Sequence, residues 1–532
     1  MPTTKKPAAT TKKTTAAKKP AAKKPAAKPA APKATTPAKM PSKAIKPVAS
    51  KELKAVPLKI LFAASECWPF AGTGGLGEVI GSLPKALGAS GAADARVILP
   101  LYESFPENLR DKLRFITHIN VGLSWRMQYC GVFSLQKDGV TYYFVDNEYY
   151  FRRPNLYGYY DDAERFAFFS RAVLDVLPYI DFKPDVIHCN DWQTALVPIY
   201  YKLFYQYRPE YTDIKQLYTI HNIEYQGRFD QNILEDVFGI PKHEYPSVEW
   251  GNGVNLTKAA LDYCDCISTV SPSYANELRE AFYAHGLEAA ITKNSHKIRG
   301  ILNGIDTNGW NPSADKALFA EYNLMDVSGK ASNKAELQSM LSLPVRADVP
   351  LIAMITRLVA HKGLDLLKDA ADEILKRDVQ IVVLGTGDAA FVDYLSHLTS
   401  VYPGKFHSII AWNKDLSHKI YGAADIFLMP SKSEPCGLSQ MISARYGTIP
   451  IVRATGGLKD SIEDCGAGDT GIGFVFNNYD AVEMTHAIDR AVGLYRDYKT
   501  KWNGLIRRAM SADFSWTTSA KEYAKMYQDI VK

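Results

Sequence analysis

Short apolar runs alternate with amphipathic stretches from Val56 to the end of the chain. A first series contains LKILFAAS, ARVILPLY, GVTYYFVD, DVIHCND, KQLYTIHN and CISTVSP. After a polar stretch around 313–348, a second series contains PLIAMITRL, VQIVVLGTG, FHSIIAW, DIFLMPS and IPIVRATG. Apolar strands separated by helices are typical of parallel sheets that are buried on both faces. The two series predict an α/β chain with two doubly wound domains that face each other across a cleft.

Polar residues directly follow several of these strands, where open parallel sheets bind their ligands. Asp191 and Trp192 follow DVIHCN, and His221 and Asn222 follow LYTI. Asp191 is either a ligand-binding carboxylate or a helix N-cap beside a packed indole. His221 is either a donor or base in a site, or a histidine that is satisfied within the core.

Two cations and a carboxylate follow strands of the second series. Arg357 and Lys362 flank the loop of ITRLVAHKG, where the planar fork of arginine and the point charge of lysine suit a pyrophosphate. Glu434 precedes a helix in SEPCGLSQM, where a carboxylate beside free N–H groups suits sugar hydroxyls and phosphate oxygens. Further turns contain Gly385 and the pair Gly456–Gly457. Alternatively, Arg357 and Lys362 lie in an ordinary surface loop, and Glu434 only interacts with the dipole of the helix that follows it.

A glycine-rich stretch, PFAGTGGLGEVIGSLPKAL at residues 69–87, follows the first apolar run. A strand, a glycine-rich turn and a helix favour anion binding by backbone N–H groups. The stretch matches neither the dinucleotide fingerprint nor the Walker loop, and it has no cation among its glycines. A tight turn that lets the helix approach the strand is the alternative.

Charge is divided unevenly along the chain. Residues 1–55 contain 15 Lys, no Arg and one Glu, a balance of +14. The whole chain carries +6, so subtracting the tail leaves −8 for residues 56–532. The Lys/Ala/Pro-rich composition predicts a disordered tail, which is either an arm for a polyanion or a solubilising extension.

The length of the chain and its cysteines narrow the class of protein further. A chain of 532 residues predicts two or three domains, and no apolar run reaches the roughly 18–20 residues of a membrane-spanning helix. The N-terminus lacks the apolar segment of a signal peptide. Seven scattered cysteines predict buried thiols in a reducing compartment rather than disulfides or a zinc site, and we expect a cytoplasmic protein.

Ten ordered blocks of this sequence carry a family resemblance. They are TGGLGEVIGSLPKAL, ERFAFFSRA, CNDWQTALVP, TIHNIEYQG, TVSPSYANEL, LNGIDTNGWNP, TRLVAHKGLDLL, SEPCGLSQM, GTIPIVRATGGLKDSI and DFSWTTSAKEY. From about Leu58 to its end, the chain resembles the bacterial glycogen synthase and plant starch synthase family, retaining GT-B glycosyltransferases with two Rossmann-like domains. After the tail (1–56), which composition predicts, the resemblance implies an N-terminal acceptor-side domain (57–297), a C-terminal nucleotide-sugar domain (298–512) and a helix that crosses back to the N-terminal domain (513–532).

The resemblance also implies roles for particular residues. Arg357 and Lys362 would hold the diphosphate, Glu434 the donor glucose, and Asp191 would lie near the reacting centre. The catalytic set is Asp191, His221, Arg357, Lys362 and Glu434. The substrate-binding set is Gly74, Gly75, Trp192, Asn222, Asn255, Gly385, Cys436, Gly437, Leu438, Gly456 and Gly457. Asn255 of the substrate-binding set and His221 of the catalytic set would contact the glucose. Gly74 and Gly75 would let the loop approach the donor phosphate.

The reaction implied is transfer of glucose from ADP-glucose to the non-reducing 4-OH of an α-1,4-glucan, with retention and without a metal or cofactor. No nucleophile is assigned, because a front-face mechanism assisted by the leaving phosphate is preferred in this fold. Cleft closure would exclude water. The alternatives are a GT-B enzyme that uses UDP-glucose or another acceptor, a non-catalytic glucan-binding relative, and a protein that binds nucleic acid through its basic tail.

One position departs from the family pattern. The glycine-rich loop usually begins Lys-x-Gly-Gly-Leu, with the lysine close to donor and acceptor, whereas this chain has Gly72 there. Either the site relies on Arg357 and Lys362 alone, with altered donor preference or affinity, or a cation from elsewhere takes the place of the lysine.

Overall fold

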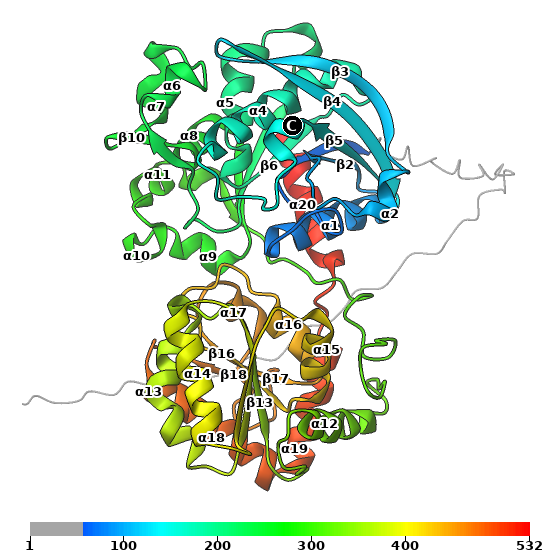
Figure 1. Cartoon of the computed structure of the whole chain (residues 1–532), viewed down its shortest axis with the longest axis vertical. Coiled ribbons are helices and arrows are strands. Elements are labelled where there is room, and N and C mark those ends of the chain that lie inside the picture. The colour runs from blue at the N-terminus through cyan, green and yellow to red at the C-terminus, as the bar shows by residue number, and fades with distance from the viewer. Residues whose placement is uncertain (1–56) are drawn as a thin grey trace, which may run out of the picture. The chain divides into compact units, whose positions relative to one another are not determined.

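Two separate β-sheets organise residues 57–532, the part of the chain that this computed structural model describes (Figure 1). The basic tail lies outside the described residues, so its disorder and its contact with a polyanion stay predictions. Each of the eleven apolar runs named above contains a strand, which confirms the predicted α/β fold of two parallel sheets. The domain boundaries at 297 and 512 stay predictions.

The N-terminal sheet consists of β1 (Leu58–Ala63), β2 (Ala93–Pro100), β3 (Arg114–Leu123), β4 (Arg126–Lys137), β5 (Val140–Asp146), β6 (Val186–Asn190), β7 (Lys215–Ile220), β11 (Cys266–Thr269) and β12 (Ile298–Gly300). Their spatial order is β12–β11–β7–β6–β1–β2–β5–β4–β3. The strands from β12 to β5 are parallel, and β4 and β3 continue the sheet antiparallel. The antiparallel edge was not predicted, because β3 has only two buried residues, Val121 and Leu123, and therefore lacks the continuous apolar run of a strand that is covered on both faces.

The C-terminal sheet consists of β13 (Leu351–Ile355), β14 (Gln380–Gly385), β15 (Phe406–Ile410), β16 (Ile426–Met429), β17 (Ile449–Arg453) and β18 (Phe474–Phe476). Their order is β15–β14–β13–β16–β17–β18, and every pair is parallel. A small antiparallel sheet is formed by β8 (Arg228–Asp230), β9 (Glu249–Trp250) and β10 (Gly253–Asn255). In each of the two large sheets, the loops that follow the parallel strands meet at the carboxyl ends of these strands, where they can form a site.

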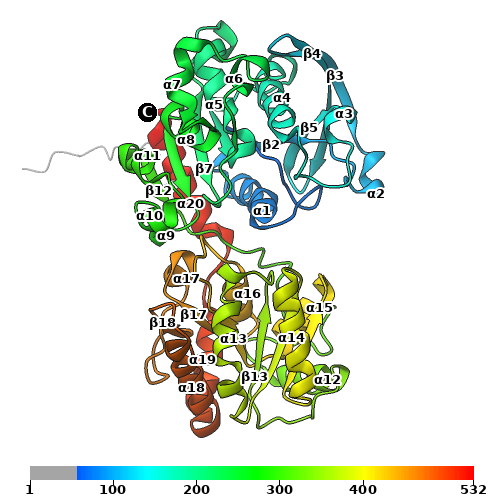
Figure 2. The ribbon, with the colours of Figure 1, turned by 60° about the vertical axis from the view of Figure 1, so that its left-hand side comes forward.

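Helices connect the strands and cover both sheets (Figure 2). In the N-terminal half they are α1 (Gly75–Ala89), α2 (Glu107–Arg110), α3 (Glu148–Phe151), α4 (Asp162–Asp175), α5 (Leu196–Tyr200), α6 (Ile233–Asp236), α7 (Tyr245–Val248), α8 (Leu256–Tyr263), α9 (Pro272–Glu277), α10 (Ala281–Ala284) and α11 (Glu288–Lys293). In the C-terminal half they are α12 (Ser328–Met340), α13 (Leu364–Leu375), α14 (Ala389–Val401), α15 (Lys414–Ala423), α16 (Ser439–Arg445), α17 (Gly456–Ser461), α18 (Ala481–Asp497) and α19 (Lys499–Ser511).

The last helix, α20 (Trp516–Val531), returns to the N-terminal sheet and packs against α1 (Figures 1 and 2). The buried Tyr527 forms a hydrogen bond of 2.8 Å between its hydroxyl and Nδ1 of His188 on β6. Tyr523 and Met526 are also buried among residues of the first sheet. The C-terminal segment therefore belongs to the core of the N-terminal half.

The cysteines and the hydropathy of the helices were also predicted from the sequence. All seven cysteines are free and buried, as predicted. None of the helices in residues 57–532 combines the length and hydropathy needed to cross a bilayer.

We expect Tyr527→Ala to lower the free energy of unfolding by about 3–5 kcal/mol, because it empties a fully buried aromatic site between α20 and β6. Tyr527→Phe keeps the ring and removes only the hydrogen bond, so it should cost about 1 kcal/mol. Urea unfolding of both variants measures the difference. Equal and small losses would contradict a core role for α20.

Candidate active site

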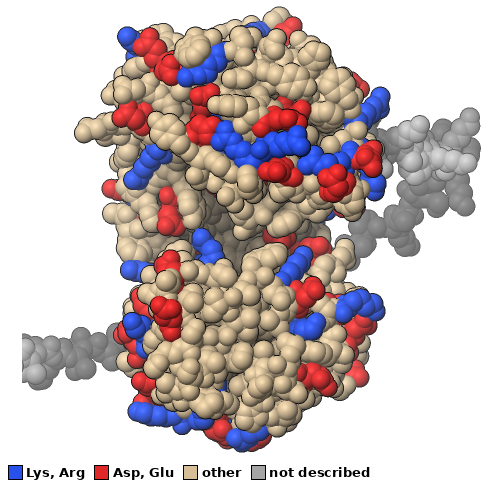
Figure 3. Space-filling model, viewed as in Figure 1, with Lys and Arg blue, Asp and Glu red and all other residues tan. Residues whose placement is uncertain are grey.

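Two adjoining pockets lie at the carboxyl ends of the parallel strands. The larger pocket has a volume of about 850 Å³ and the smaller pocket about 610 Å³. Both are lined by loops from the two halves of the chain, and the surface is hollowed where these halves meet (Figure 3). Thr73 and Arg357 line both pockets, so a ligand that extends from one pocket into the other passes these residues.

Most of the residues that the sequence singled out come together in the larger pocket. Its lining includes Gly74, Gly75, Asp191, Trp192, His221, Asn222, Arg357, Lys362, Glu434, Cys436, Gly437 and Leu438. These residues come from loops after β1, β6, β7, β13 and β16. Gly385 lies instead in the smaller pocket, at the end of β14.

Asn255 lies outside both pockets, contrary to its expected contact with the sugar. Its side chain is fully buried and caps α8, with Oδ1 accepting the Lys258 N–H at 3.0 Å. Its Nδ2 donates to Oε1 of Gln226 at 2.6 Å. Both ends of the amide are used inside the protein, so the residue stabilises a helix start.

A partly buried ion pair joins Lys362, predicted to bind the diphosphate, to Glu434, predicted to bind the sugar. Nζ of Lys362 lies 2.7 Å from Oε2 of Glu434, and the Ser431 hydroxyl donates to the same oxygen at 3.0 Å. Oε1 of Glu434 has no hydrogen-bond partner in residues 57–532. One carboxylate oxygen is thus fixed by the protein while the other is available to a ligand.

The geometry of this pair depends on a close backbone approach. Lys362 ends a short 3-10 turn before α13, and Gly363 follows with φ of +80°. A Cβ atom at Gly363 would lie 2.3 Å from the carbonyl oxygen of Pro430, at the end of β16. Only glycine therefore allows this turn to reach the loop that carries Glu434.

Arg357 lies two residues after β13, and its side chain makes no hydrogen bond or ion pair with any residue of the described chain. It lines both pockets. A guanidinium without a protein partner at the boundary of two pockets is well placed to bind an anionic group of a ligand.

Asp191 and His221 are joined by a hydrogen bond in the larger pocket. Oδ1 of Asp191 accepts the backbone N–H of His221 at 2.7 Å, and Asp191 adopts φ of +56°, a strained conformation typical of functional sites. Burial raises the pKa of Asp191 to about 7 and lowers the pKa of His221 to about 3. His221 is therefore neutral at physiological pH. The Asp191 carboxyl is only partly ionised there.

The tautomer of His221 follows from its neighbour Asn190. Nδ2 of Asn190 donates to the carbonyl oxygens of Ala63 and His188, which leaves Oδ1 as an acceptor. Nε2 of His221 lies 2.9 Å from this Oδ1 and therefore carries the proton. Nδ1 is the nitrogen with a free lone pair.

The glycine-rich loop was predicted to bind phosphate through its backbone N–H groups, and this stays a prediction. The N–H groups of Thr73 and Gly74 donate to Oε2 of Glu66 at 2.7 and 3.3 Å, so the protein's own carboxylate occupies them. The space beside Gly74 and Gly75 is open, with no atom within 4 Å of a Cβ built there. A ligand can approach this backbone closely, but the Gly74 amide already has an acceptor.

Several polar residues of the larger pocket were missed by the sequence reasoning, Glu66 and Asn303 among them. Glu66 follows β1 and also accepts the Tyr157 hydroxyl at 2.8 Å. Asn303 is 5% exposed, and its buried Oδ1 has no partner in the described residues. Both follow strands, so the rule that located Asp191 and His221 also applies to them.

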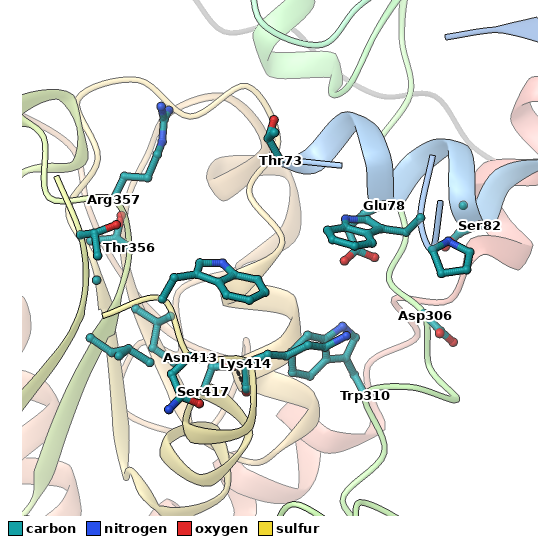
Figure 4. A pocket seen from close by; sticks show the side chains of 18 of the residues that line it. Thr73, Glu78, Ser82, Asp306, Trp310, Thr356, Arg357, Asn413, Lys414 and Ser417 are labelled. Atoms are coloured by element: carbon teal, nitrogen blue, oxygen red, sulfur yellow. Dashed lines mark hydrogen bonds between the residues drawn. The ribbon is translucent and has the colours of Figure 1, made fainter. Parts of the chain in front are cut away.

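The smaller pocket differs in chemistry from the larger one. Three indoles line it, from Trp68, Trp310 and Trp412, together with carboxylates of Glu78 and Asp306. In Figure 4, Thr356 and Arg357 lie on one side of this pocket, and Thr73 and Glu78 lie on the other. Lys85, Lys137 and Lys414 also line this pocket, so flat aromatic walls stand beside many polar and charged groups, which suits a planar ligand that has polar edges.

Comparison with known proteins decides the family. A model of the starch synthase catalytic domain matches residues 59–293, and one of group 1 glycosyl transferases matches residues 340–501. Glycogen synthase from Clostridium botulinum (strain Alaska E43 / Type E3) is 47% identical over 480 residues, which cover 89% of this chain and 99% of that protein. The chain belongs to the glycogen synthase and starch synthase family.

Other relatives agree with this family. Glycogen synthase from Geobacillus stearothermophilus is 47% identical over 89% of this chain and 98% of its own. The catalytic domain of starch synthase IV from Arabidopsis thaliana, bound to ADP and acarbose, has a TM-score of 0.83 and 36% identity, over 89% of this chain and 99% of that chain. Sucrose-phosphate synthase from Thermosynechococcus elongatus, with a TM-score of 0.55 and 18% identity over 89% and 98%, shares the fold. The predicted GT-B glycosyltransferase is confirmed.

At Gly72, where the family pattern has a lysine, the indole of Trp68 lies close to the backbone. A Cβ atom at Gly72 would lie 2.8 Å from both Cε2 and Nε1 of Trp68. A Cβ atom at Gly77 would lie 3.0 Å from Cδ1 of the same indole. The Trp68 ring therefore fills the space that a side chain at position 72 needs.

We expect Gly72→Lys to lower the free energy of unfolding by about 1–3 kcal/mol, because the new side chain forces the indole to move. Gly88→Lys is the control, since Gly88 lies on α1, the helix that follows this loop, and has no atom within 4 Å of its Cβ position. The cost should shrink when Trp68→Ala is combined with Gly72→Lys, as a double-mutant cycle in urea measures. Additive costs would contradict competition for one space.

Proposed function

We propose that this chain transfers glucose, with retention, from ADP-glucose to the non-reducing 4-OH of an α-1,4-glucan. The observation that carries the proposal is Arg357, a guanidinium without a protein partner in the described chain that lines both pockets. A nucleotide sugar has its diphosphate between a planar nucleoside and a polar sugar, which matches this order of sites. The ADP bound to the similar starch synthase IV domain supports an adenine nucleotide as the donor.

The diphosphate would bind Arg357 and Lys362. Lys362 is already paired with Glu434 at 2.7 Å, so its ammonium group is held in place before the donor binds. As the bond between glucose and phosphate breaks, negative charge grows on the leaving diphosphate. Fixed cations that stabilise this charge lower the barrier, and they supply the positive charge without a metal ion.

The donor glucose would lie in the larger pocket. Oε1 of Glu434 is free to accept a sugar hydroxyl, and the amide of Asn303 offers a buried Oδ1 without a partner in the described residues. The adenosine would lie in the smaller pocket, where the three indoles offer stacking surfaces.

We assign no covalent nucleophile. Asp191 is the carboxylate near the reacting centre, but its Oδ1 is held by the His221 N–H, and its raised pKa leaves it partly protonated at pH 7. Retention then proceeds on one face of the sugar, with the leaving phosphate accepting the proton of the acceptor hydroxyl. The protein contributes by positioning both substrates and by stabilising the leaving group.

The test of the function is one incubation of the purified chain with glycogen and either ADP-glucose or UDP-glucose, scored by elongation of the glucan. We expect elongation with ADP-glucose. Elongation only with UDP-glucose would move the chain to the alternative donor, and no elongation with either donor would overturn the proposal in favour of a non-catalytic glucan-binding relative.

Arg357→Ala should lower kcat on the order of 10²–10³-fold, because the leaving diphosphate loses its cation at the pocket boundary. Arg346→Ala is the matched control, since this exposed arginine pairs with Asp348 and Asp378 away from both pockets. Steady-state elongation rates and thermal unfolding are measured for both variants. Near-wild-type turnover in a folded Arg357→Ala protein would remove the leaving-group role.

A further inference from the structure

Helices α9 and α17 join the two halves of the chain beside the larger pocket. The Ser271 hydroxyl donates to the carbonyl oxygen of Pro435 at 2.6 Å. The N–H and the hydroxyl of Ser273 donate to the carboxylate of Asp460 at 2.7 and 2.6 Å. The sheet that carries Asp191 and the loop that carries Glu434 are thus linked by direct hydrogen bonds.

Glu277, the last residue of α9, makes the third link. Its Oε1 accepts the N–H of Gly456 at 2.8 Å and the hydroxyl of Thr455 at 3.1 Å. Its Oε2 is buried and has no partner within residues 57–532. Burial raises the pKa of Glu277, while the Gly456 amide, the Thr455 hydroxyl and the charge of Arg453 oppose this shift. The carboxylate therefore binds the first amide of α17 from the opposite half of the chain.

The first turn of α17 in turn supports the loop of Glu434. The Gly457 N–H donates to the carbonyl oxygens of Glu434 and Pro435 at 3.2 and 3.1 Å. A Cβ atom at Gly456 would lie 2.1 Å from the Glu434 oxygen, and one at Gly457 would lie 2.2 Å from the Cys436 oxygen. The two backbones are in direct contact, so a movement of α17 displaces the turn at 434–436.

We propose that Glu277 is a positioning residue for the transfer reaction: it fixes the first turn of α17, which fixes the turn that carries Glu434. The inference rests on the proposed function, in which Glu434 holds the donor glucose. A displacement of about 1 Å in a positioned group can cost on the order of 10²-fold in rate. Glu277 itself lines neither pocket, so it acts through α17.

The bonding pattern suggests a decisive set of variants. Both hydrogen bonds of Glu277 use Oε1, so Glu277→Gln keeps both acceptor contacts. Glu277→Ala removes them, and Glu277→Asp withdraws the oxygen while keeping the charge. Ser273→Ala is the matched control, because it removes a hydrogen bond of the same junction at the other end of α17.

We expect Glu277→Ala to lower kcat by about 10- to 100-fold, with little change in the KM for ADP-glucose. Glu277→Gln and Ser273→Ala should stay within about threefold of the wild type. If Glu277→Ala fails to fold, Glu277→Asp is expected to show the same loss of kcat at wild-type thermal stability. A kcat near wild type in the folded variant would overturn the proposal, as would equal losses in Glu277→Gln or Ser273→Ala.

Hydrogen exchange gives a readout that does not depend on the proposed function. In Glu277→Ala, the amides of residues 453–461 and 431–438 should exchange about tenfold faster than in the wild type, whereas those regions should be unchanged in Glu277→Gln. Unchanged exchange in Glu277→Ala would overturn the coupling. If the wild-type chain fails to elongate glycogen while exchange responds as expected, the proposed function fails and the coupling through α17 stands.

Discussion

The parallel direction of the strands is the constraint on which the site depends. Because neighbouring strands run the same way, the loops after β1, β6 and β7 meet at one edge of the first sheet. The loops after β13 and β16 meet at one edge of the second sheet. The two edges contribute different groups: the first provides Asp191 and the neutral His221, and the second provides the cations of Arg357 and Lys362 and the carboxylate of Glu434.

Glycines allow the backbones of these loops to come into direct contact. Gly363 lets the Lys362 turn reach the backbone at Pro430, and Gly456 and Gly457 let α17 touch the turn of Glu434. The result is an active site in which most polar groups are held by the protein before a ligand arrives. The guanidinium of Arg357 differs from these groups, since it has no hydrogen-bond or ion-pair partner in the described chain and lines both pockets.

The strands and the main site residues could be predicted because both follow from local pattern: apolar runs locate strands, and polar residues directly after them locate the site. Contacts between distant segments could not be predicted in this way. Asn255 looked like a sugar ligand, but it caps α8 and bonds to Gln226. Gly74 looked like an open cradle, but its amide meets Glu66 across the loop. The space beside Gly72 is filled by Trp68, which no spacing rule reveals.

The central claim is that one nucleotide sugar spans both pockets with its diphosphate at Arg357. A crystal structure of the chain with ADP tests this claim most directly. The account predicts diphosphate oxygens within hydrogen-bond distance of Arg357 and Lys362 and the adenine among the indoles of the smaller pocket. A diphosphate bound away from Arg357, or an adenine in the larger pocket, would contradict it.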